Sequence, residues 1–251
     1  MTNAFDLTGT AAIVTGANTG IGQAVALALA GAGADVALAG RSRADETAGQ
    51  VRALGCRAAL IDADLGTAEP AQRIVDETLA ALGRLDILVN NAGIIRRADA
   101  VDYSEDDWDA VLGTNLKSLF FLCQAAGRHM IGRGRGKIVN IASLLSFQGG
   151  IRVPGYTAAK SGVAGLTKAL ANEWAGKGVN VNAIAPGYIA TNNTAALQAD
   201  ETRNRQILER IPAGRWGAPS DIGGAAVFLA SPASDYVNGH VLAVDGGWLG
   251  R

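Results

Sequence analysis

Residues 11–22, AAIVTGANTGIG, decide the fold. The apolar, β-branched run from Ala11 to Thr15 predicts a buried strand, and the alanine-rich run from Ile21 to Ala32 predicts a helix directly after it. The turn between them has glycines at the spacing G-x-x-x-G-x-G. Glycines at a turn from strand to helix let the backbone approach a phosphate group, which the N-terminus of a helix also favours. This stretch therefore predicts a βαβ unit with a phosphate-binding turn.

Short apolar runs and longer segments of helical period alternate along the rest of the chain. Strict alternation predicts a parallel sheet covered by helices on both faces, and right-handed crossovers make that sheet doubly wound. No repeat or interdomain linker divides the sequence, so we expect one Rossmann-like α/β domain over residues 1–251. The further predicted strands are 35–39, 57–61, 85–89, 137–141, 179–184 and 240–244, and the further predicted helices are 44–54, 71–82, 108–133 (as one helix or two), 156–175 and 221–230.

One segment, residues 187–212, interrupts this alternation. It is polar and charged, and it lies between the sixth predicted strand and the next helix. Insertions of this length in a compact domain are usually functional, and they often close over a ligand. We therefore expect residues 187–212 to form a substrate lid.

The composition excludes several classes of protein. Of 251 residues, 49% are hydrophobic and 18% are charged, which is enough apolar material for a core and too little charge for disorder. The net charge of −1 does not suggest a polyanionic partner such as nucleic acid. The two cysteines, Cys56 and Cys123, lie in apolar segments and are expected to be buried free thiols. The two histidines, His129 and His240, form no metal-ligand pattern with them, so no metal is expected.

The N-terminal sequence and the apolar runs bear on location. Residues 1–16 lack a basic stretch followed by a long apolar core, so we expect no signal peptide. No apolar run reaches the roughly 20 residues that a membrane-spanning helix needs. We therefore expect a cytoplasmic protein with no membrane contact.

A second stretch, residues 143–160, SLLSFQGGIRVPGYTAAK, carries the candidate chemistry. Tyr156 and Lys160 share one face if the stretch is helical, and a neighbouring ammonium lowers the pKa of a phenol. Such a phenol can pass a proton to or from a substrate oxygen near neutral pH, and the hydroxyl of Ser143 could hold the same oxygen. A lysine follows a given tyrosine at this spacing by chance roughly one time in twenty, so the pair alone is weak evidence. We interpret the stretch as an oxidoreductase site.

The end of the second predicted strand bears on the choice of cofactor. NAD-binding proteins place an acidic residue there for the ribose hydroxyls, whereas an arginine suits the 2′-phosphate of NADP. Here the strand ends without a carboxylate and Arg41 and Arg43 follow, so we favour NADP(H) and keep NAD(H) as an alternative. Both arginines could instead be solvated charges. After the third predicted strand, Asp64 is a candidate partner for the adenine amine, and the small residues 90–93, NNAG, would let the cofactor pass close.

In their order and spacing, the motifs of the chain resemble those of the short-chain dehydrogenase/reductase family, of the classical type. The match covers essentially the whole chain, and motifs that are weak or moderate singly are strong together. The resemblance implies a single Rossmann-like domain with a seven-stranded parallel sheet, a nicotinamide cofactor, no metal and, commonly, a homotetramer. The matching motifs are TGANTGIG at 15–22, NNAG at 90–93, Asn115, Ser143, YTAAK at 156–160, and PG at 186–187 followed by Thr191.

The resemblance also implies roles for individual residues. Tyr156 is then the general acid/base, Lys160 lowers its pKa and binds the nicotinamide ribose, and Ser143 holds the substrate oxygen. Asn115 supports a water through which protons reach solvent; as a structural alternative, it bends an otherwise apolar helix. The residues implied in cofactor binding are Gly16, Asn18, Thr19, Gly20, Ile21, Gly22, Arg41, Ser42, Asp64, Leu65, Asn91, Ala92, Gly93, Tyr156, Lys160, Pro186, Gly187, Ile189 and Thr191.

The loops expected around the site are rich in cations and amides and poor in large apolar groups. A small hydroxylated acid fits such walls better than a steroid or a long acyl chain does. Beside Ser143 and Tyr156, the candidate substrate ligands are Arg96, Gln148 and Arg152, although each arginine could equally be a surface charge. The other polar or aromatic residues of these loops are Arg97, Asn192, Asn193, Arg215 and Trp216.

At finer grain, residues 94–97, 143–154, 182–194 and 211–217 resemble the sugar-acid branch of the family, the dehydrogenases of gluconate and 2-deoxygluconate. We therefore expect reversible hydride transfer between NAD(P) and a secondary alcohol or ketone of a sugar acid. Two alternatives stay open. A 3-oxoacyl-(acyl-carrier-protein) reductase shares every motif named above. A nucleotide-binding regulatory protein could keep the fold without turnover, although such proteins usually lose the tyrosine or the lysine.

Overall fold

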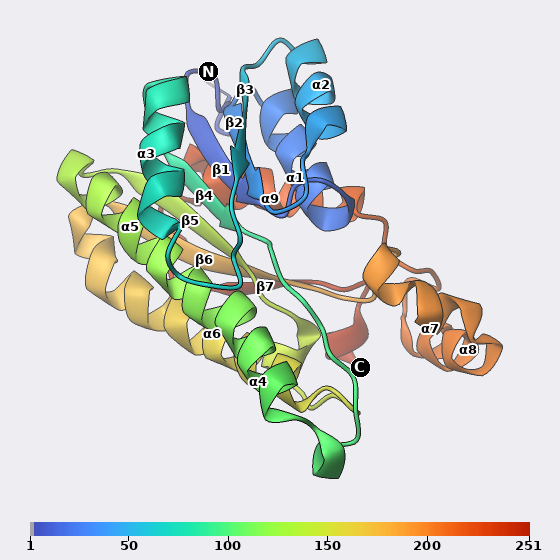
Figure 1. Cartoon of the computed structure of the whole chain (residues 1–251). Helices are drawn as coiled ribbons and strands as arrows, with labels where there is room; N and C mark the ends of the chain where they lie inside the picture. Colours follow the sequence, from blue (N-terminus) through green and yellow to red (C-terminus); the bar gives the residue numbers. More distant parts are fainter. Residues whose placement is uncertain (1–2) are drawn as a thin grey trace.

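Seven parallel strands form one sheet in the computed structural model, which describes residues 3–251 (Figure 1). Their order is β3-β2-β1-β4-β5-β6-β7, so the direction of winding reverses between β1 and β4. The predicted seven-stranded, doubly wound sheet is therefore confirmed, and each predicted strand boundary lies within two residues of the observed one. The strands are β1 (Ala11–Thr15), β2 (Asp35–Gly40), β3 (Ala58–Asp62), β4 (Ile87–Asn90), β5 (Gly136–Ile141), β6 (Val179–Pro186) and β7 (Val241–Val244).

Helices cover both faces of the sheet, and successive side chains of a strand enter the two cores alternately (Figure 1). In β1, Ala11 and Ile13 pack with α3, α5 and α6, whereas Ala12 and Val14 pack with α1, α2 and α9. A strand that is buried on both faces needs apolar residues at every position, which explains the continuous apolar runs. The helices are α1 (Gly20–Gly31), α2 (Asp45–Ala53), α3 (Ala71–Leu82), α5 (Leu119–Arg133), α6 (Pro154–Trp174) and α9 (Ser220–Ala230).

The segment predicted as one or two helices over 108–133 is two helices joined by a turn of π-helix. The first, α4 (Glu105–Leu112), begins after Ser104, whose side chain caps it. Residues Gly113–Ser118 then widen to the π-helical pattern before α5 begins. Such widenings are rare and occur mostly at functional sites. Here the widened turn places Asn115 beside the loop that follows β4.

Residues 187–212 stand out from the body of the molecule and include two short helices that the sequence did not predict (Figure 1). The second helix is strongly polar and buries Ile207, which belongs to a small core with Leu144, Ile211 and Trp248. The helix is therefore held by contacts that are distant in sequence, which no local pattern can reveal. The elements of this segment are a 3-10 turn (Asn192–Thr194), α7 (Ala195–Ala199) and α8 (Glu201–Arg210).

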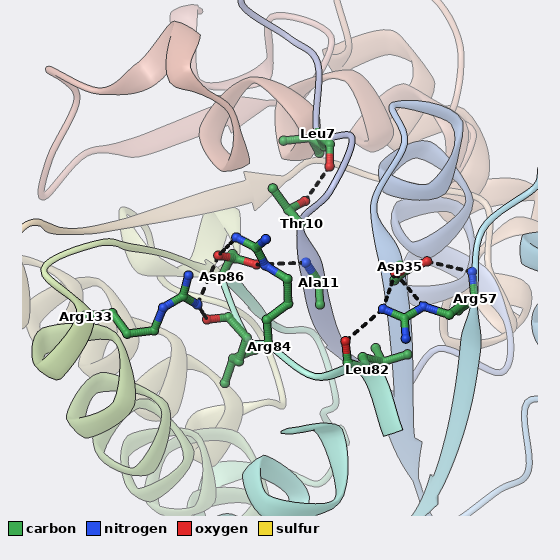
Figure 2. Close-up of polar contacts among 10 residues, drawn as sticks. Leu7, Thr10, Ala11, Asp35, Arg57, Leu82, Arg84, Asp86 and Arg133 are labelled. Atoms are coloured by element: carbon green, nitrogen blue, oxygen red, sulfur yellow. Dashed lines mark hydrogen bonds and ion pairs between the residues drawn. The ribbon is translucent and has the colours of Figure 1, made fainter. Parts of the chain in front are cut away.

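A charged cluster ties together the amino edge of the sheet (Figure 2). The buried carboxylate of Asp86 accepts hydrogen bonds from the Ala11 amide at 2.9 Å and from Arg84 at 2.6 and 2.8 Å. Arg133 of α5 adds a hydrogen bond at 3.2 Å. Burial raises the pKa of this carboxyl, but the bonds from Arg84 and Ala11 and the charges of both arginines outweigh burial and hold the pKa below its usual range. Asp86 thus joins β1, α5 and the segment that leads into β4.

We predict that Asp86→Asn lowers the free energy of unfolding by about 1–3 kcal/mol at neutral pH, because it removes a buried charged acceptor. The loss is moderate because both arginines are partly exposed and stay solvated. Since the native pKa lies below the unfolded one, the contribution is present above the unfolded pKa and is lost as pH falls through the native pKa. Urea unfolding should therefore separate wild type from variant at neutral pH and bring them together in acid. Equal stabilities at neutral pH would contradict this role of Asp86.

Candidate active site

The candidate residues meet at the carboxyl edge of the sheet, beside the reversal of strand order between β1 and β4. Because all strands are parallel, the turns after β1, β4, β5 and β6 open onto the same edge. The glycine turn follows β1, the NNAG turn follows β4, and Ser143 follows β5. Helix α6 adds Tyr156 and Lys160 from its first two turns. The topology thus gathers residues from most of the chain at one place.

Helix α6 sets the relation of Tyr156 to Lys160. It begins at Pro154, whose fixed φ suits the first turn of a helix. Lys160 lies one turn after Tyr156, with its Nζ 5.6 Å from the centre of the phenol ring. This nitrogen is buried and donates a hydrogen bond of 2.6 Å to the backbone oxygen of Ile141, the last residue of β5. Burial lowers the pKa of Lys160 to about 8.

The predicted fall in the pKa of Tyr156 is wrong for this structure. Burial raises the pKa of the phenol above its usual value, and the hydrogen bond with Ser143 and the charge of Arg97 offset only part of that rise. Lys160 does not enter this balance, because its nitrogen is directed to the backbone oxygen of Ile141. The two side chains share one face of the helix as predicted, but spacing alone overstates the effect of the ammonium on the phenol.

Ser143 lies between β5 and a 3-10 turn, Leu144–Ser146. Its Oγ accepts a hydrogen bond of 3.2 Å from the Leu145 amide, which restrains the side chain and leaves the hydroxyl hydrogen available for donation. The same hydroxyl interacts with the Tyr156 phenol and lowers its pKa, against the effect of burial. The two hydroxyls can therefore contact the same substrate oxygen.

Asn115 is buried, and its amide pairs with the backbone of Ile94 in both directions. Oδ1 accepts a hydrogen bond from the Ile94 amide and Nδ2 donates one to the Ile94 oxygen, each at 2.8 Å. A Cβ on Gly93 would lie 3.1 Å from Oδ1, which favours a glycine in the NNAG turn. The side chain thus positions the loop after β4. Because the Asn115 side chain is engaged with Ile94, a water would have to bind to backbone groups that the π-helical turn shifts out of the regular helical pattern. The support of a water therefore stays a prediction.

The glycine turn after β1 has the shape that a pyrophosphate needs. Gly16 and Gly20 have φ values of 63° and 60°, and a Cβ on Gly22 would overlap Gly16 O and Asn91 Nδ2. Asn91 Nδ2 donates to Thr15 O at 2.9 Å and to Gly16 O at 3.1 Å, so the NNAG turn fixes the glycine turn. No described side chain caps the first turn of α1, which holds no acid, so its amides suit phosphate oxygens. The other predicted cofactor residues in these two turns are Asn18, Thr19, Ile21, Ala92 and Gly93.

The residues after β2 distinguish the two candidate arginines. Arg41 and Ser42 are exposed directly after the strand. Arg43 is held in an ion pair of 2.8 Å with Asp45, whereas Arg41 has no ion-pair partner within residues 3–251. A cofactor phosphate would therefore find Arg41 free, whereas at Arg43 it would have to displace Asp45.

The two predicted cofactor residues after β3 point in opposite directions. Asp64 is exposed, and its Oδ1 accepts a hydrogen bond of 2.9 Å from the Gly66 amide, which leaves the second oxygen for an adenine amine. Leu65 is buried in the core, so only its backbone could contact a cofactor. Their roles stay predictions.

The first residues of the predicted lid lie against the glycine turn. Pro186 ends β6, and Gly187 leads from it into the segment. Ile189 is buried, and the Cγ2 of Thr191 would lie 3.5 Å from a Cβ on Gly20. Residues that are about 170 positions apart in the sequence thus meet at one edge of the sheet.

Each predicted substrate ligand outside the hydroxyl pair already has a partner in the protein. Arg96 pairs with Asp107 at 3.3 Å, and Arg152 pairs with Asp99 at 2.9 Å. Gln148 accepts a hydrogen bond of 3.3 Å from an indole of the C-terminal segment. Because exposed ion pairs contribute only about 0–1 kcal/mol, a substrate could replace them. Their role in substrate binding stays a prediction.

Arg97, the neighbour of Arg96, has no ion-pair partner within residues 3–251, and its charge acts on Tyr156. Against the burial that raises the pKa of Tyr156, the charge of Arg97 lowers it, so the guanidinium acts on the phenol itself. Its hydrogen bond within residues 3–251 goes to the backbone oxygen of Asn193, at 3.3 Å. In the sequence the two arginines are equivalent neighbours after the NNAG turn, and only the folded loop decides that Arg96 pairs with Asp107 while Arg97 stays without a carboxylate partner in the described part of the chain.

The remaining predictions concern the two cysteines, metal binding and membrane contact. Cys56 and Cys123 are free, but only Cys123 is buried as predicted, whereas Cys56 is partly exposed. Burial raises the pKa of the Cys123 thiol to about 12, so it is no activated nucleophile. Within residues 3–251, no group of three or more His, Cys, Asp or Glu side chains could hold a metal ion. No helix in that part of the chain is long and apolar enough to cross a membrane.

Comparisons with known proteins cover nearly the whole chain. A family model described as Enoyl-(Acyl carrier protein) reductase matches residues 16–249. The chain is 59% identical over 250 residues to the 2-dehydro-3-deoxy-D-gluconate 5-dehydrogenase of Escherichia coli, with 99% of each chain covered.

Two solved structures extend this similarity. One is of an Agrobacterium tumefaciens protein described as a 2-deoxy-D-gluconate 3-dehydrogenase with bound NADP, and the match has 62% identity and a TM-score of 0.93 over 100% of both chains. The other is a gluconate 5-dehydrogenase from Burkholderia cenocepacia in complex with NADP and tartrate. It matches with 41% identity and a TM-score of 0.94, over 99% of this chain and 98% of that one.

Proposed function

The chain belongs to the short-chain dehydrogenase/reductase family, and we propose that it is an NADP(H)-dependent dehydrogenase of a small sugar acid. It is an oxidoreductase that acts on CH–OH groups. One observation carries the choice of substrate: the positive charge of Arg97 lowers the pKa of the Tyr156 phenol, and Arg97 has no carboxylate partner within residues 3–251. A cation beside the proton donor suits a substrate that carries a carboxylate as well as its reacting alcohol or ketone.

The proposed reaction uses the two hydroxyls as a pair. In reduction, Tyr156 would donate its proton to the ketone oxygen, and in oxidation it would take that proton back. Ser143 would donate a hydrogen bond to the same oxygen, so that both groups stabilise the negative charge that develops there. The nicotinamide cofactor supplies or accepts the hydride when it is bound. Lys160 would hold the ribose and keep a positive charge near the oxygen below about pH 8.

Two relatives support a sugar acid as substrate. The Escherichia coli relative is named for a deoxy keto sugar acid, and the Burkholderia structure contains tartrate, a small hydroxylated dicarboxylate. Near Arg97, the exposed pairs of Arg96 and Arg152 add exchangeable cations, and Gln148 adds an amide. Such groups suit the carboxylate and hydroxyls of a sugar acid.

A 3-oxoacyl-(acyl-carrier-protein) reductase is the second candidate, and the matching family model carries a description of related chemistry. An acidic carrier would need unpaired basic residues around the entrance of the site. Arg96, Arg152 and Arg215 are instead each accompanied by an aspartate, so these pairs add no net positive charge that would attract an acidic carrier. A regulatory protein without turnover is the third candidate, and the presence of both Tyr156 and Lys160 argues against it.

The preference for NADP(H) rests on the end of β2. Arg41 is exposed there and has no ion-pair partner within residues 3–251. The end of β2, just before Arg41, lies next to the glycine turn, since a Cβ on Gly40 would be 3.7 Å from the Gly16 amide nitrogen. The Agrobacterium and Burkholderia structures both contain NADP.

A homotetramer in the cytoplasm is the proposed state of the protein. A hollow of about 820 Å³ on the outer side of α4, α5 and α6 is lined mostly by apolar and small residues, and it lies apart from Ser143 and Tyr156. Gly165 in this hollow leaves open space into which a helix of a second copy could pack. The two free thiols fit a reducing compartment.

Initial rates with the purified protein test the proposed reaction. We expect oxidation of D-gluconate, 2-deoxy-D-gluconate or 2-dehydro-3-deoxy-D-gluconate with NADP, and reduction of 5-keto-D-gluconate with NADPH. Tyr156→Phe should lower kcat by at least about 10²-fold, because it removes the proton donor. Turnover of an acetoacetyl thioester but of no sugar acid would favour the carrier-protein reductase. Binding of NADPH without turnover of any of these substrates would contradict the enzyme assignment.

Arg41→Ala tests the choice of cofactor. Loss of one charged contact to the 2′-phosphate should raise the KM for NADPH by about tenfold or more and leave the KM for NADH unchanged. Arg43→Ala is the matched control, because Arg43 is already paired with Asp45 and should matter little to either cofactor. An equal effect of Arg41→Ala on both cofactors would refute its phosphate role.

Arg97→Ala tests the origin of substrate selectivity. If the guanidinium binds the carboxylate, the KM for the sugar acid should rise by about 10–100-fold, and the effect should vanish with a neutral polyol. Arg96→Ala, which removes an arginine already paired with Asp107, should have a smaller effect. Comparable losses in both variants, or a loss that persists with the neutral substrate, would contradict the assignment.

A further inference from the structure

Two hydroxyl groups fasten the 3-10 turn Leu144–Ser146 to helix α6. Ser146 Oγ donates a hydrogen bond of 2.6 Å to the backbone oxygen of Lys160. In the opposite direction, Ser161 Oγ donates a hydrogen bond of 3.2 Å to the backbone oxygen of Leu145. Each segment thus supplies one hydroxyl to a carbonyl of the other.

The turn needs such an attachment because it has little rigidity of its own. It is a single 3-10 turn, and such turns have poorer hydrogen-bond geometry than an α-helix. Gly149 and Gly150 follow it, and they restrain the backbone less than any other residue would. Leu144 anchors one side of the turn in the small core with Ile207 and Trp248. The side that faces α6 depends on the two hydroxyls.

Lys160 is bound at both of its ends. Its side-chain nitrogen donates to Ile141 O at 2.6 Å, and its backbone oxygen accepts from Ser146 Oγ, also at 2.6 Å. These two contacts lie just before and just after Ser143 in the sequence. Ser143 is therefore bracketed by attachments to the residue that lies one turn from Tyr156.

We propose that Ser146 is a positioning residue of the active site, which fixes the separation of the Ser143 and Tyr156 hydroxyls through its hydrogen bond to the Lys160 oxygen. This role rests on the proposed function, because it matters only where both hydroxyls act on one substrate oxygen. Ser146 itself would contact neither substrate nor cofactor. The bond from Ser146 is the shorter of the two, so it should restrain the turn against α6 more than the bond from the exposed Ser161 does.

A positioning role of Ser146 and a purely structural role predict different losses of turnover in a variant without the hydroxyl. Loss of one partly buried hydrogen bond lowers stability modestly, and for a chain of this size it should lower Tm by about 2–4 °C. A misplacement of about 1 Å between reacting groups can lower turnover by up to about 10²-fold. The variant should therefore lose far more turnover than its loss of stability explains.

The titration of Tyr156 supplies a second, independent readout. The groups that face the phenol are Lys160 on α6, Ser143 after β5 and Arg97 after β4. Burial raises the phenol pKa, and the hydrogen bond with Ser143 counters that rise. If Ser143 moves away, the counteracting effect weakens and the pKa rises further. Oxidation, which needs the phenol as a base, should then increase with pH through a higher apparent pKa.

Kinetics of Ser146→Ala, with NADP and the best sugar acid, test this role. We expect kcat to fall about tenfold while the KM for NADP stays within about twofold, and Ser146→Thr, which keeps the hydroxyl, should recover most of kcat. Ser231→Ala is the matched control, since that buried hydroxyl also donates to a backbone oxygen, Phe228 O at 3.0 Å, at the end of α9. It should lower Tm to a similar extent and leave kcat unchanged.

Three results would overturn the proposal: an unchanged kcat in Ser146→Ala, a loss of kcat equal to that in the control, or a loss in Ser146→Thr as large as in Ser146→Ala. If Ser146→Ala does not fold at the assay temperature, Ser161→Ala replaces it, since it removes the weaker bond of the same pair. It should lower kcat in the same direction, and an unchanged kcat would again refute the role.

A readout without turnover separates this proposal from the proposed function. In protein labelled with 13Cζ-tyrosine, NMR follows the Tyr156 phenol, and its signal is assigned by its loss in Tyr156→Phe. Ser146→Ala should raise the Tyr156 pKa, and Ser231→Ala should not, whether or not a sugar acid is turned over. An unchanged titration refutes the role of Ser146, whereas a wild-type protein that oxidises no sugar acid refutes the proposed function.

Discussion

The hydrogen bond from the buried Lys160 ammonium to the backbone oxygen of Ile141 holds the site together. Burial disfavours the charged form of this group and lowers its pKa to about 8, and the short charge-assisted bond offsets part of that cost. The bond joins α6 to the end of β5. One turn back along α6 lies Tyr156, and two residues beyond Ile141 lies Ser143. The two candidate reacting hydroxyls thus take their positions from a single contact between helix and sheet.

Asparagine side chains extend this constraint across the sheet. Asn140 of β5 donates to Thr167 of α6 at 3.0 Å and accepts from Asn90 of β4 at 2.9 Å. Asn91 fixes the glycine turn after β1, and Asn115 fixes the loop after β4. An amide can donate and accept at once, so each of these residues can connect two elements. These asparagines cross-link the carboxyl edge of the sheet from β1 to α6.

Local patterns predict the strands and the glycine turn of this molecule. Strands that are buried on both faces need unbroken apolar runs, and the turn needs a glycine at position 22 because there is no space for a Cβ there. The spacing of Tyr156 and Lys160 likewise predicts a shared helical face. It does not predict the direction of the phenol pKa, which depends on burial by other elements. Arg97 could not be separated from Arg96, since a loop has no period that assigns side chains to faces. The helix α8 depends on Trp248, which comes almost forty residues later.

The central claim is that one oxygen of a sugar acid contacts both Ser143 and Tyr156 while its carboxylate contacts Arg97. A crystal structure of the protein with NADP and D-gluconate tests this claim most directly. We predict that the reacting hydroxyl lies within hydrogen-bond distance of Ser143 Oγ and Tyr156 Oη, with the carboxylate against the Arg97 guanidinium. A sugar acid bound with its hydroxyls away from this pair, or with its carboxylate on Arg96 or Arg152 and Arg97 unengaged, would contradict it.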